Sequence, residues 1–201
     1  MTRSSDLIKT VEAALRTPGA ASSDFDLNPT HELPPDRRLR EAAVLILLSD
    51  LGGSAEVLLT KRASGLKHHP GQIAFPGGKK DLGDKNLRDA ALREAREEVA
   101  LPEGYAKILG VLPPHETVTR FTVTPHVAQL VKSFEPRPEP GEVAEVFSVP
   151  LAHVLDPENY IVEGRRWQGK TRHYYTLPYG PYYIWGATAR MLRGLADQVS
   201  R

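Results

Sequence analysis

The sequence predicts an α+β fold in which a mixed sheet packs against two principal helices. Two longer segments, 86–100 and 183–199, carry apolar residues at helical spacing. Short apolar segments of strand type, bounded by turn residues, make up most of the rest: 42–48, 57–62, 106–112, 117–131, 143–149, 160–165 and 173–177. The chain has 201 residues, which is enough for one full-sized domain with its own core.

The first 38 residues are expected to form a helix and a linker arm, and the main domain is expected to cover 39–201. Residues 6–16 place their apolar side chains at helical spacing, which predicts a short amphipathic helix that docks on the main domain. Residues 17–38 contain four prolines and few large apolar residues, which indicates a linker or a surface arm. The arm could cover its own domain or a partner subunit, so the sequence leaves a homodimer open.

The main domain begins with a buried strand at 42–48, which a turn at 50–53 joins to a hairpin partner at 57–62. Residues 63–74 are expected to be a polar loop, and the pair Gly77-Gly78 is expected to break any regular element. Either Asp84 or Asn86 could cap the helix that follows. This helix carries an apolar stripe whose small alanines would let it lie close to a sheet.

In the second half of the chain, a turn at 113–115 is expected to separate two strands, and three prolines at 134–141 indicate a loop. A strand at 143–149, one helical turn at 151–154 and two further strands follow. The final helix places four apolar side chains inward: Ala187, Met191, Leu192 and Leu195.

Composition excludes several classes of function. The chain has no cysteine, which excludes disulfides, thiolate catalysis and cysteine-ligated metal sites. Its formal net charge of +1 provides no global basic surface for nucleic acid. Residues 1–23 lack the apolar run of a signal peptide, and no stretch approaches the roughly 20 apolar residues that span a bilayer. We therefore expect a cytoplasmic protein with a small-molecule substrate and no nucleic-acid or membrane partner.

A cluster of carboxylates in the first long helix indicates the chemistry. Glu94, Glu97 and Glu98 follow at i, i+3 and i+4, so they share one helix face, where Arg93 can brace Glu97 and Arg96 points elsewhere. Carboxylates this close repel each other, and a divalent cation would relieve the repulsion. Ligands that are all oxygen suit Mg²⁺ or Mn²⁺. The cluster therefore predicts metal-assisted chemistry on a phosphate ester or anhydride.

The run from Gly78 to Leu101 resembles the Nudix box, whose centre is Arg-Glu-x-x-Glu-Glu. This centre is intact at 93–98. The run departs from the box in three places, because Asp84 replaces the first glutamate, one extra residue precedes the arginine, and Ala100 replaces the late glycine.

The segments 58–62 (Leu-Leu-Thr-Lys-Arg) and 69–78 (His-Pro-Gly-Gln-Ile-Ala-Phe-Pro-Gly-Gly), with Asp81, resemble the signature of the coenzyme A pyrophosphatase branch of the Nudix family. That branch also tends to carry an aspartate and an extra residue in its box. Lys67 stands where the branch usually has arginine, which keeps the charge but not bidentate phosphate recognition. Residues 184–190 are also similar, so the resemblance covers roughly 40–198.

The resemblance implies an α/β/α Nudix sandwich and hydrolysis of a nucleoside diphosphate linked to another group. For coenzyme A the products would be 3′,5′-ADP and 4′-phosphopantetheine, or its acyl form. It further implies that Glu94, Glu97 and Glu98 bind Mg²⁺ or Mn²⁺ with the Gly78 carbonyl, and that Arg93 orients the carboxylates.

Other residues are candidates for proton transfer and substrate binding. A carboxylate must accept a proton from the attacking water, and Glu97, Glu98 and Glu145 are all candidates for that role. The loop with Lys61, Arg62, Lys67, His68 and His69 supplies positive charge for phosphates.

Two further positions complete the expected site. A glycine at position 77 lets the backbone approach a ligand closely. Arg120 lies with His115 and Glu116 between two predicted strands and could face the site.

Three alternatives remain open. The substrate could be ADP-ribose, a dinucleotide such as NADH, or a nucleoside triphosphate. The chain could be a non-catalytic Nudix-fold binding module, although the intact glutamates argue against that. An RNA-processing role is disfavoured by the near-neutral charge.

Overall fold

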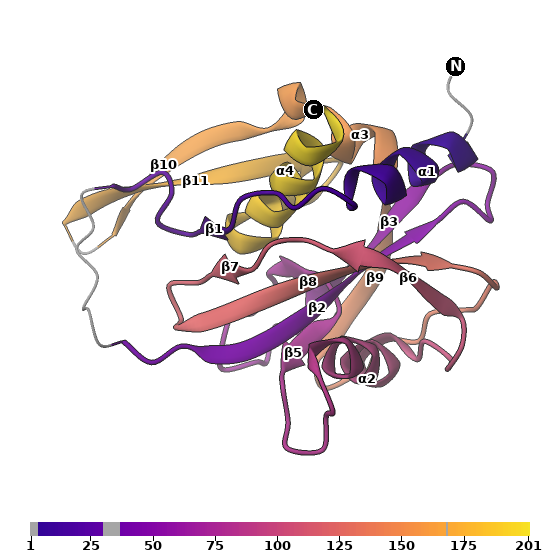
Figure 1. Cartoon of the computed structure of the whole chain (residues 1–201). Helices are drawn as coiled ribbons and strands as arrows, with labels where there is room; N and C mark the ends of the chain where they lie inside the picture. The colour runs from indigo at the N-terminus through magenta and orange to yellow at the C-terminus, as the bar shows by residue number, and fades with distance from the viewer. Residues whose placement is uncertain (1–3, 30–36, 168) are drawn as a thin grey trace.

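The computed structural model describes residues 4–29, 37–167 and 169–201, and within them a large mixed sheet lies between helices (Figure 1). α2 (Leu87–Val99) covers one face of this sheet. α1 (Ser4–Ala14), α3 (Leu151–Leu155) and α4 (Gly186–Val199) lie on the other side. This arrangement confirms the predicted α+β sandwich.

The main sheet has nine strands in the described residues. Along its path the order is β1 (Ser22–Ser23), β7 (His115–Glu116), β8 (Phe121–Leu130), β2 (Arg40–Ser49), β3 (Glu56–Arg62) and β4 (Ile73–Ala74). Three strands pair off this path: β5 (Gly77–Lys79) with β2, β6 (Ala106–Val111) with β8, and β9 (Val143–Pro150) with β3.

A second sheet lies above the main one in Figure 1 and contains β10 (Ile161–Trp167), β11 (Lys170–Tyr179) and β12 (Tyr182–Trp185). Its core-facing Leu177 and Ile184 are fully buried and belong to the same apolar cluster as Leu192 and Leu195 of α4. This shared core joins the second sheet, the C-terminal helix and the main sheet.

β2 is the central strand, because it pairs in parallel with β8 and antiparallel with β3 and β5. Helices or strands cover both of its faces, so its side chains are apolar on both. Leu45 and Leu47 pack in the α2-side cluster, whereas Ile46 and Leu48 pack in the opposite one.

α2 has a side-chain cap at its N-terminal end and a left-handed residue at its C-terminal end. The Asn86 side chain accepts a hydrogen bond from Asp89 N at 3.0 Å, so Asn86 is the N-cap, and the alternative cap Asp84 was wrong. The helix ends at Ala100, whose φ of 59° lies in the left-handed region that favours glycine. The late glycine of the Nudix box therefore corresponds here to a left-handed helix cap occupied by alanine.

The predicted N-terminal helix is present, and the arm that follows it lies along its own domain. Gln198 Nε2 donates to Ala14 O at 2.9 Å and to Thr17 O at 2.7 Å. β1 pairs in parallel with β7, and the Asn28 side chain exchanges two 2.9 Å hydrogen bonds with the backbone of His173. Part of the predicted arm, 30–36, lies outside the described residues.

Several expected boundaries were wrong. Pairing with neighbouring strands extends regular structure into some segments whose own sequence favours a loop or turn. Two elements start later than expected, because a hydrogen-bonded turn precedes β8 and strand β12 precedes α4. The differences are β4 within the expected loop 63–74, β5 at the glycine pair, β7 within the expected turn, a start of β8 at Phe121, and a start of α4 at Gly186.

No helix within the described ranges is long and apolar enough to cross a bilayer.

Candidate functional site

The site forms where β5 passes beneath α2. β5 pairs with Ala42–Val44 of β2, and this pairing places the two glycines against the sheet and the helix. A Cβ added at Gly77 would lie 2.5 Å from Ala43 O, and one at Gly78 would lie 2.3 Å from Glu94 Oε1. Gly77 has no space for a side chain because backbone atoms of β2 would be in the way, whereas a side chain at Gly78 would displace the Glu94 carboxylate, a predicted metal ligand.

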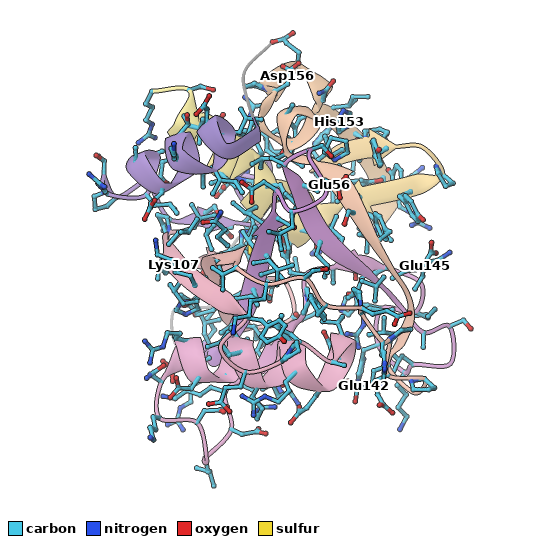
Figure 2. The ribbon with its side chains drawn as sticks, turned by 90° about the vertical axis from the view of Figure 1, so that its right-hand side faces the viewer. Glu56, Lys107, Glu142, Glu145, His153 and Asp156 are labelled. Atoms are coloured by element: carbon cyan, nitrogen blue, oxygen red, sulfur yellow. The ribbon has the colours of Figure 1, made fainter. Side chains whose placement is uncertain are left out.

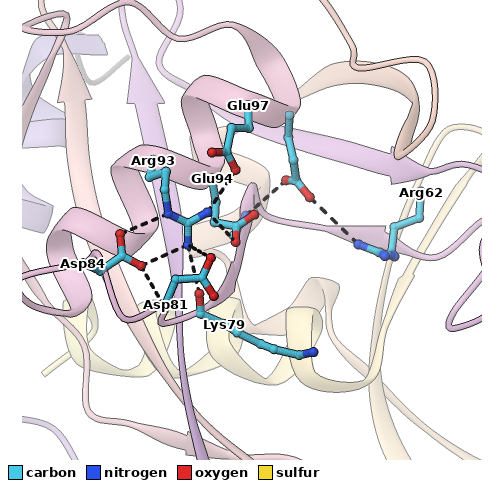
Figure 3. A network of polar contacts seen from close by, with 9 residues as sticks. Arg62, Lys79, Asp81, Asp84, Arg93, Glu94 and Glu97 are labelled. Carbon is cyan, nitrogen blue, oxygen red and sulfur yellow. Dashed lines mark hydrogen bonds and ion pairs between the residues drawn. The ribbon is translucent and has the colours of Figure 1, made fainter.

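Arg93 is the centre of a dense polar network on α2 (Figure 3). Its Nε and Nη2 each donate to an Asp84 carboxylate oxygen at 3.0 Å, which is a bidentate pair. Its Nη1 donates to Glu94 Oε1 at 3.1 Å and to Glu97 Oε2 at 2.9 Å. Nη2 also donates to Lys79 O at 3.1 Å. The expected contact between Arg93 and Glu97 is therefore present, and Asp84 fixes the guanidinium from the other side.

The charges in this network shift each other's pKa. The hydrogen bonds from Arg93 lower the pKa of the Asp84 carboxyl. The same hydrogen bonds to Asp84, together with the nearby Glu94, raise the pKa of the Arg93 guanidinium. Asp84 therefore stays ionised and Arg93 stays charged. The structure gives Asp84 the role of anchoring Arg93.

Glu98 points inward from α2, and it is only 3% exposed. Its Oε2 accepts a hydrogen bond from Gly77 N at 3.1 Å, and Arg62 Nη1 approaches Oε1 only to 3.9 Å. Burial, the largest effect, raises the pKa of Glu98 to about 7, although the Gly77 N–H opposes the shift. This carboxylate is therefore buried without full compensation of its charge.

The three glutamates fit a divalent cation by their chemistry. They supply only oxygen donors, Glu98 is an under-compensated buried carboxylate, and burial also raises the pKa of Glu94. In the described part of the chain, however, no three acidic or histidine side chains converge closely enough to hold a metal ion as they stand. Glu94 and Glu97 instead direct oxygens to Arg93.

The loop at 63–74, which contains most of the second motif, lies next to the glutamates of α2 at Arg62. Arg62 N donates to Gln72 O at 2.9 Å and Gly71 N donates to Arg62 O at 3.1 Å, so the loop folds back onto this residue. The Arg62 Nε is buried and has no hydrogen-bond partner among the residues that the structure describes. A buried guanidinium N–H without a partner beside the carboxylates is a suitable donor for a phosphate oxygen.

The other loop cations are more exposed. Lys67 and His68 lie on the surface of the loop. His69 has a φ of 55°, and burial together with Arg62 lowers the pKa of its imidazole, which favours the neutral ring. Lys61 is exposed and is the register partner of Glu145 on β9.

The structure does not bring Glu145 to the carboxylate cluster. Phe147, two residues along β9, packs in the apolar cluster opposite α2, and side chains two apart share a face. Glu145 accepts a hydrogen bond from Tyr182 Oη of β12, and Tyr182 stacks on Phe147 with ring centroids 3.6 Å apart. Figure 2 shows Glu145 on β9, away from α2.

Glu142, which the sequence analysis did not single out, acts electrostatically on the carboxylates of α2. Its loop is bound to the end of α2, because Glu139 N donates to Glu98 O at 3.0 Å and Arg137 N donates to Val99 O at 3.1 Å. Glu142 O also accepts from Ala63 N, and its charge raises the pKa of both Glu94 and Glu98. Figure 2 shows it beside α2. In the sequence, Glu142 was marked only by its closeness to Glu145, three residues later.

Arg120 and its neighbours lie elsewhere. Arg120 is an exposed turn residue with a φ of 64°, and its carbonyl accepts from Arg40 N at the start of β2. His115 is fully buried between Ser22 Oγ at 2.9 Å and Asp24 Oδ1 at 3.1 Å. None of the contacts described for the carboxylate cluster involves these residues.

The site places the carboxylates of α2 next to the guanidinium of Arg62. The carboxylates can bind a cation, and Arg62 can bind an anion next to it. Such a pairing suits a diphosphate, whose charge must be neutralised before water can attack.

Comparisons with known proteins show the family of this chain. Residues 39–168 match the model of the NUDIX domain. A protein of Enterobacter sp. (strain 638), named as an uncharacterized Nudix hydrolase NudL, is 44% identical over 160 residues, covering 80% of this chain and 83% of that protein. A protein of the same name from Pectobacterium atrosepticum is 38% identical over 185 residues, covering 90% and 95%.

Two solved structures share the fold. A MutT/nudix family protein from Enterococcus faecalis aligns with a TM-score of 0.53 at 16% identity, covering 86% of this chain and 66% of that one. A MutT protein from Methanosarcina mazei Go1 aligns with a TM-score of 0.52 at 19% identity, covering 84% and 99%. The domain match and the sequence relatives show that the chain belongs to the Nudix hydrolase family.

Proposed function

We propose that this Nudix hydrolase cleaves the pyrophosphate bond of coenzyme A or its acyl derivatives, with Mg²⁺ or Mn²⁺. The single observation that carries the proposal is Arg62. It belongs to the segment that resembles the coenzyme A pyrophosphatase signature, its Nε is buried without a partner, and it approaches Glu98 to 3.9 Å. The signature and the carboxylates therefore belong to one site.

In the proposed reaction, Glu94, Glu97 and Glu98 hold the cation together with the Gly78 carbonyl. The cation supplies charge neutralisation and a more acidic bound water. Arg93 orients Glu94 and Glu97 through the hydrogen bonds described above. Arg62 and Lys67 hold the diphosphate, Gly77 permits its close approach, and the substrate roles of Lys61 and Arg120 remain predictions.

Glu142 is our candidate for the carboxylate that accepts the proton of the attacking water. Its loop is bonded to α2 at Glu98 O, whereas Glu145 lies on the other face of the sheet and is bound to Tyr182. Glu97 and Glu98 stay open as alternatives. Comparing the pH–rate profiles of Glu142→Gln and Glu145→Gln would show whether either residue is the base, because only loss of the true base removes the acidic limb of the profile.

We further propose that the enzyme is cytoplasmic, that an arm at 1–38 is joined to a Nudix domain at 39–201, and that the protein forms a homodimer.

The decisive experiment incubates the purified protein with coenzyme A and Mg²⁺ or Mn²⁺, with and without EDTA. EDTA-sensitive formation of 3′,5′-ADP supports the proposal. Turnover of ADP-ribose or NADH, with none of coenzyme A, would overturn the substrate and keep the family.

A further inference from the structure

β10 lies at the edge of the second sheet. In the part of the chain that the structure describes, β10 pairs with β11 on one side, and no strand pairs with its other edge. Ile161 and Val162 on this edge are 50% and 49% exposed. Its described residues contain neither proline nor a bulge, which are common devices that prevent an edge from pairing.

The contacts of Asn28 show which backbone groups face this edge. Asn28 binds both the N–H and the C=O of His173, so these groups point away from β10. His173 is the register partner of Gly164, which makes the two a non-hydrogen-bonded pair. The N–H and C=O of Gly164 therefore point outward, and by alternation so do those of Val162 and Arg166.

The charges near the β10–β11 turn are unbalanced. Arg165 lies directly opposite Arg172 in the register, and like charges in opposed positions repel. Neither arginine has an acidic partner within 4.0 Å among the described residues. Glu163 lies two residues from Arg165 on the same face of the strand.

We propose that β10 pairs antiparallel with β10 of a second copy of this chain, about a two-fold axis at Gly164. Gly164 then opposes Gly164, and Val162 opposes Arg166, all through the outward backbone groups. Glu163 of each copy opposes Arg165 of the other. The Glu163 carboxylate, which also accepts from Tyr183 Oη at 2.7 Å, then lies beside an arginine that has no acidic partner among the described residues.

The charge pattern selects this register. The outward groups also allow axes at Glu163 or at Arg165. The first would oppose two carboxylates and the second two guanidiniums, and both arrangements are repulsive. Axes at Val162 or Arg166 would leave one end of the strand unpaired. Only the axis at Gly164 combines the full strand length with two complementary charge pairs.

Sedimentation equilibrium over a range of protein concentrations tests the proposal, without reference to substrate. The wild-type chain is expected to form a dimer. Arg165→Glu and Glu163→Arg should each weaken dimerisation at least about tenfold, because each places like charges at both symmetric positions. An equimolar mixture of the two variants should recover a dimer, since both mixed pairs are then complementary. Arg16→Glu, the same charge change on the arm, should dimerise like wild type.

A second variant tests the backbone pairing. Val162→Pro removes an outward N–H but no bond to β11, so the fold should survive and the dimer should weaken. Circular dichroism establishes that the variant is folded. A wild-type chain that stays monomeric would overturn the proposal. A dimer that resists Val162→Pro, or a mixture of charge variants that fails to dimerise, would also overturn it.

Discussion

Two polar clusters, one around Glu98 on α2 and one around His115 on β7, differ in how well their buried groups are satisfied. Both ring nitrogens of His115 have a partner, Ser22 Oγ or Asp24 Oδ1, and Asp24 Oδ2 accepts from Val118 N at 2.9 Å. Glu98 has one backbone donor and a guanidinium at 3.9 Å, and burial raises its pKa.

This difference indicates that the His115 cluster stabilises the fold and that the Glu98 cluster is suited to binding a ligand. A satisfied buried network stabilises a fold, whereas an under-compensated carboxylate costs stability and is retained where a ligand will compensate it. His126 on β8 is buried without partners at either ring nitrogen, and burial lowers its pKa, so the ring is kept neutral. The positive charge of Arg88 also lowers this pKa and reinforces the neutral form of the ring.

The largest expected effect is on turnover. Glu97→Gln and Glu98→Gln each remove a metal-binding charge with little change of shape, so each should lower kcat by about a thousandfold or more while the fold stays intact. Glu145→Gln is the matched control and should stay within a few-fold of wild type. Near-normal rates of both α2 variants at low Mg²⁺ would refute the metal assignment.

The pH dependence of stability without metal comes next. The folded pKa of Glu98 is raised to about 7 from its ordinary 4.5, so the folded state holds this proton more tightly than the unfolded state. Its contribution is fully present below about pH 4.5 and is lost as pH rises through 7, by roughly 3 kcal/mol in total.

Denaturant unfolding in EDTA at pH 5 and pH 7.5 measures this loss. Glu98→Gln should flatten the profile, and added Mg²⁺ should restore stability at pH 7.5. An unchanged pH profile in the variant would show that Glu98 is already compensated.

A change in the His115 cluster should lower stability and leave turnover nearly unchanged. Asp24→Asn weakens the bonds to His115 and to Val118 N, and it should cost about 1–3 kcal/mol of unfolding free energy. Because this cluster holds the arm, kcat should change little. Thermal unfolding and steady-state kinetics measure the two effects. A large loss of kcat without loss of stability would place Asp24 in the catalytic machinery instead.

The smallest expected effect is on stability, at the C-terminal end of α2. Ala100 has a φ of 59°, and glycine adopts this conformation without strain. Ala100→Gly should raise the unfolding free energy by about 0.5–1 kcal/mol and leave turnover unchanged. Urea unfolding tests this prediction, and a destabilised variant would show that the alanine methyl contributes packing that outweighs the strain.

The site illustrates how far local sequence reasoning extends. The i, i+3, i+4 spacing of the glutamates and the contact between Arg93 and Glu97 follow from helix geometry, and the structure contains them. Asp84 lies nine residues before Arg93, and its bidentate bond to that residue depends on the path of the intervening loop. Nothing in the spacing distinguishes this role from that of a helix cap.

By itself the sequence determined the α+β class, the helix with its carboxylate face, and the Nudix family. These properties depend on periodicity and on motifs that are local in the chain. Tertiary structure alone decided that Glu142 and not Glu145 lies beside α2, that the glycine pair forms a strand with β2, and that the arm binds its own domain. Each of these depends on which segments pair across the sheet, and that pairing joins residues far apart in the sequence.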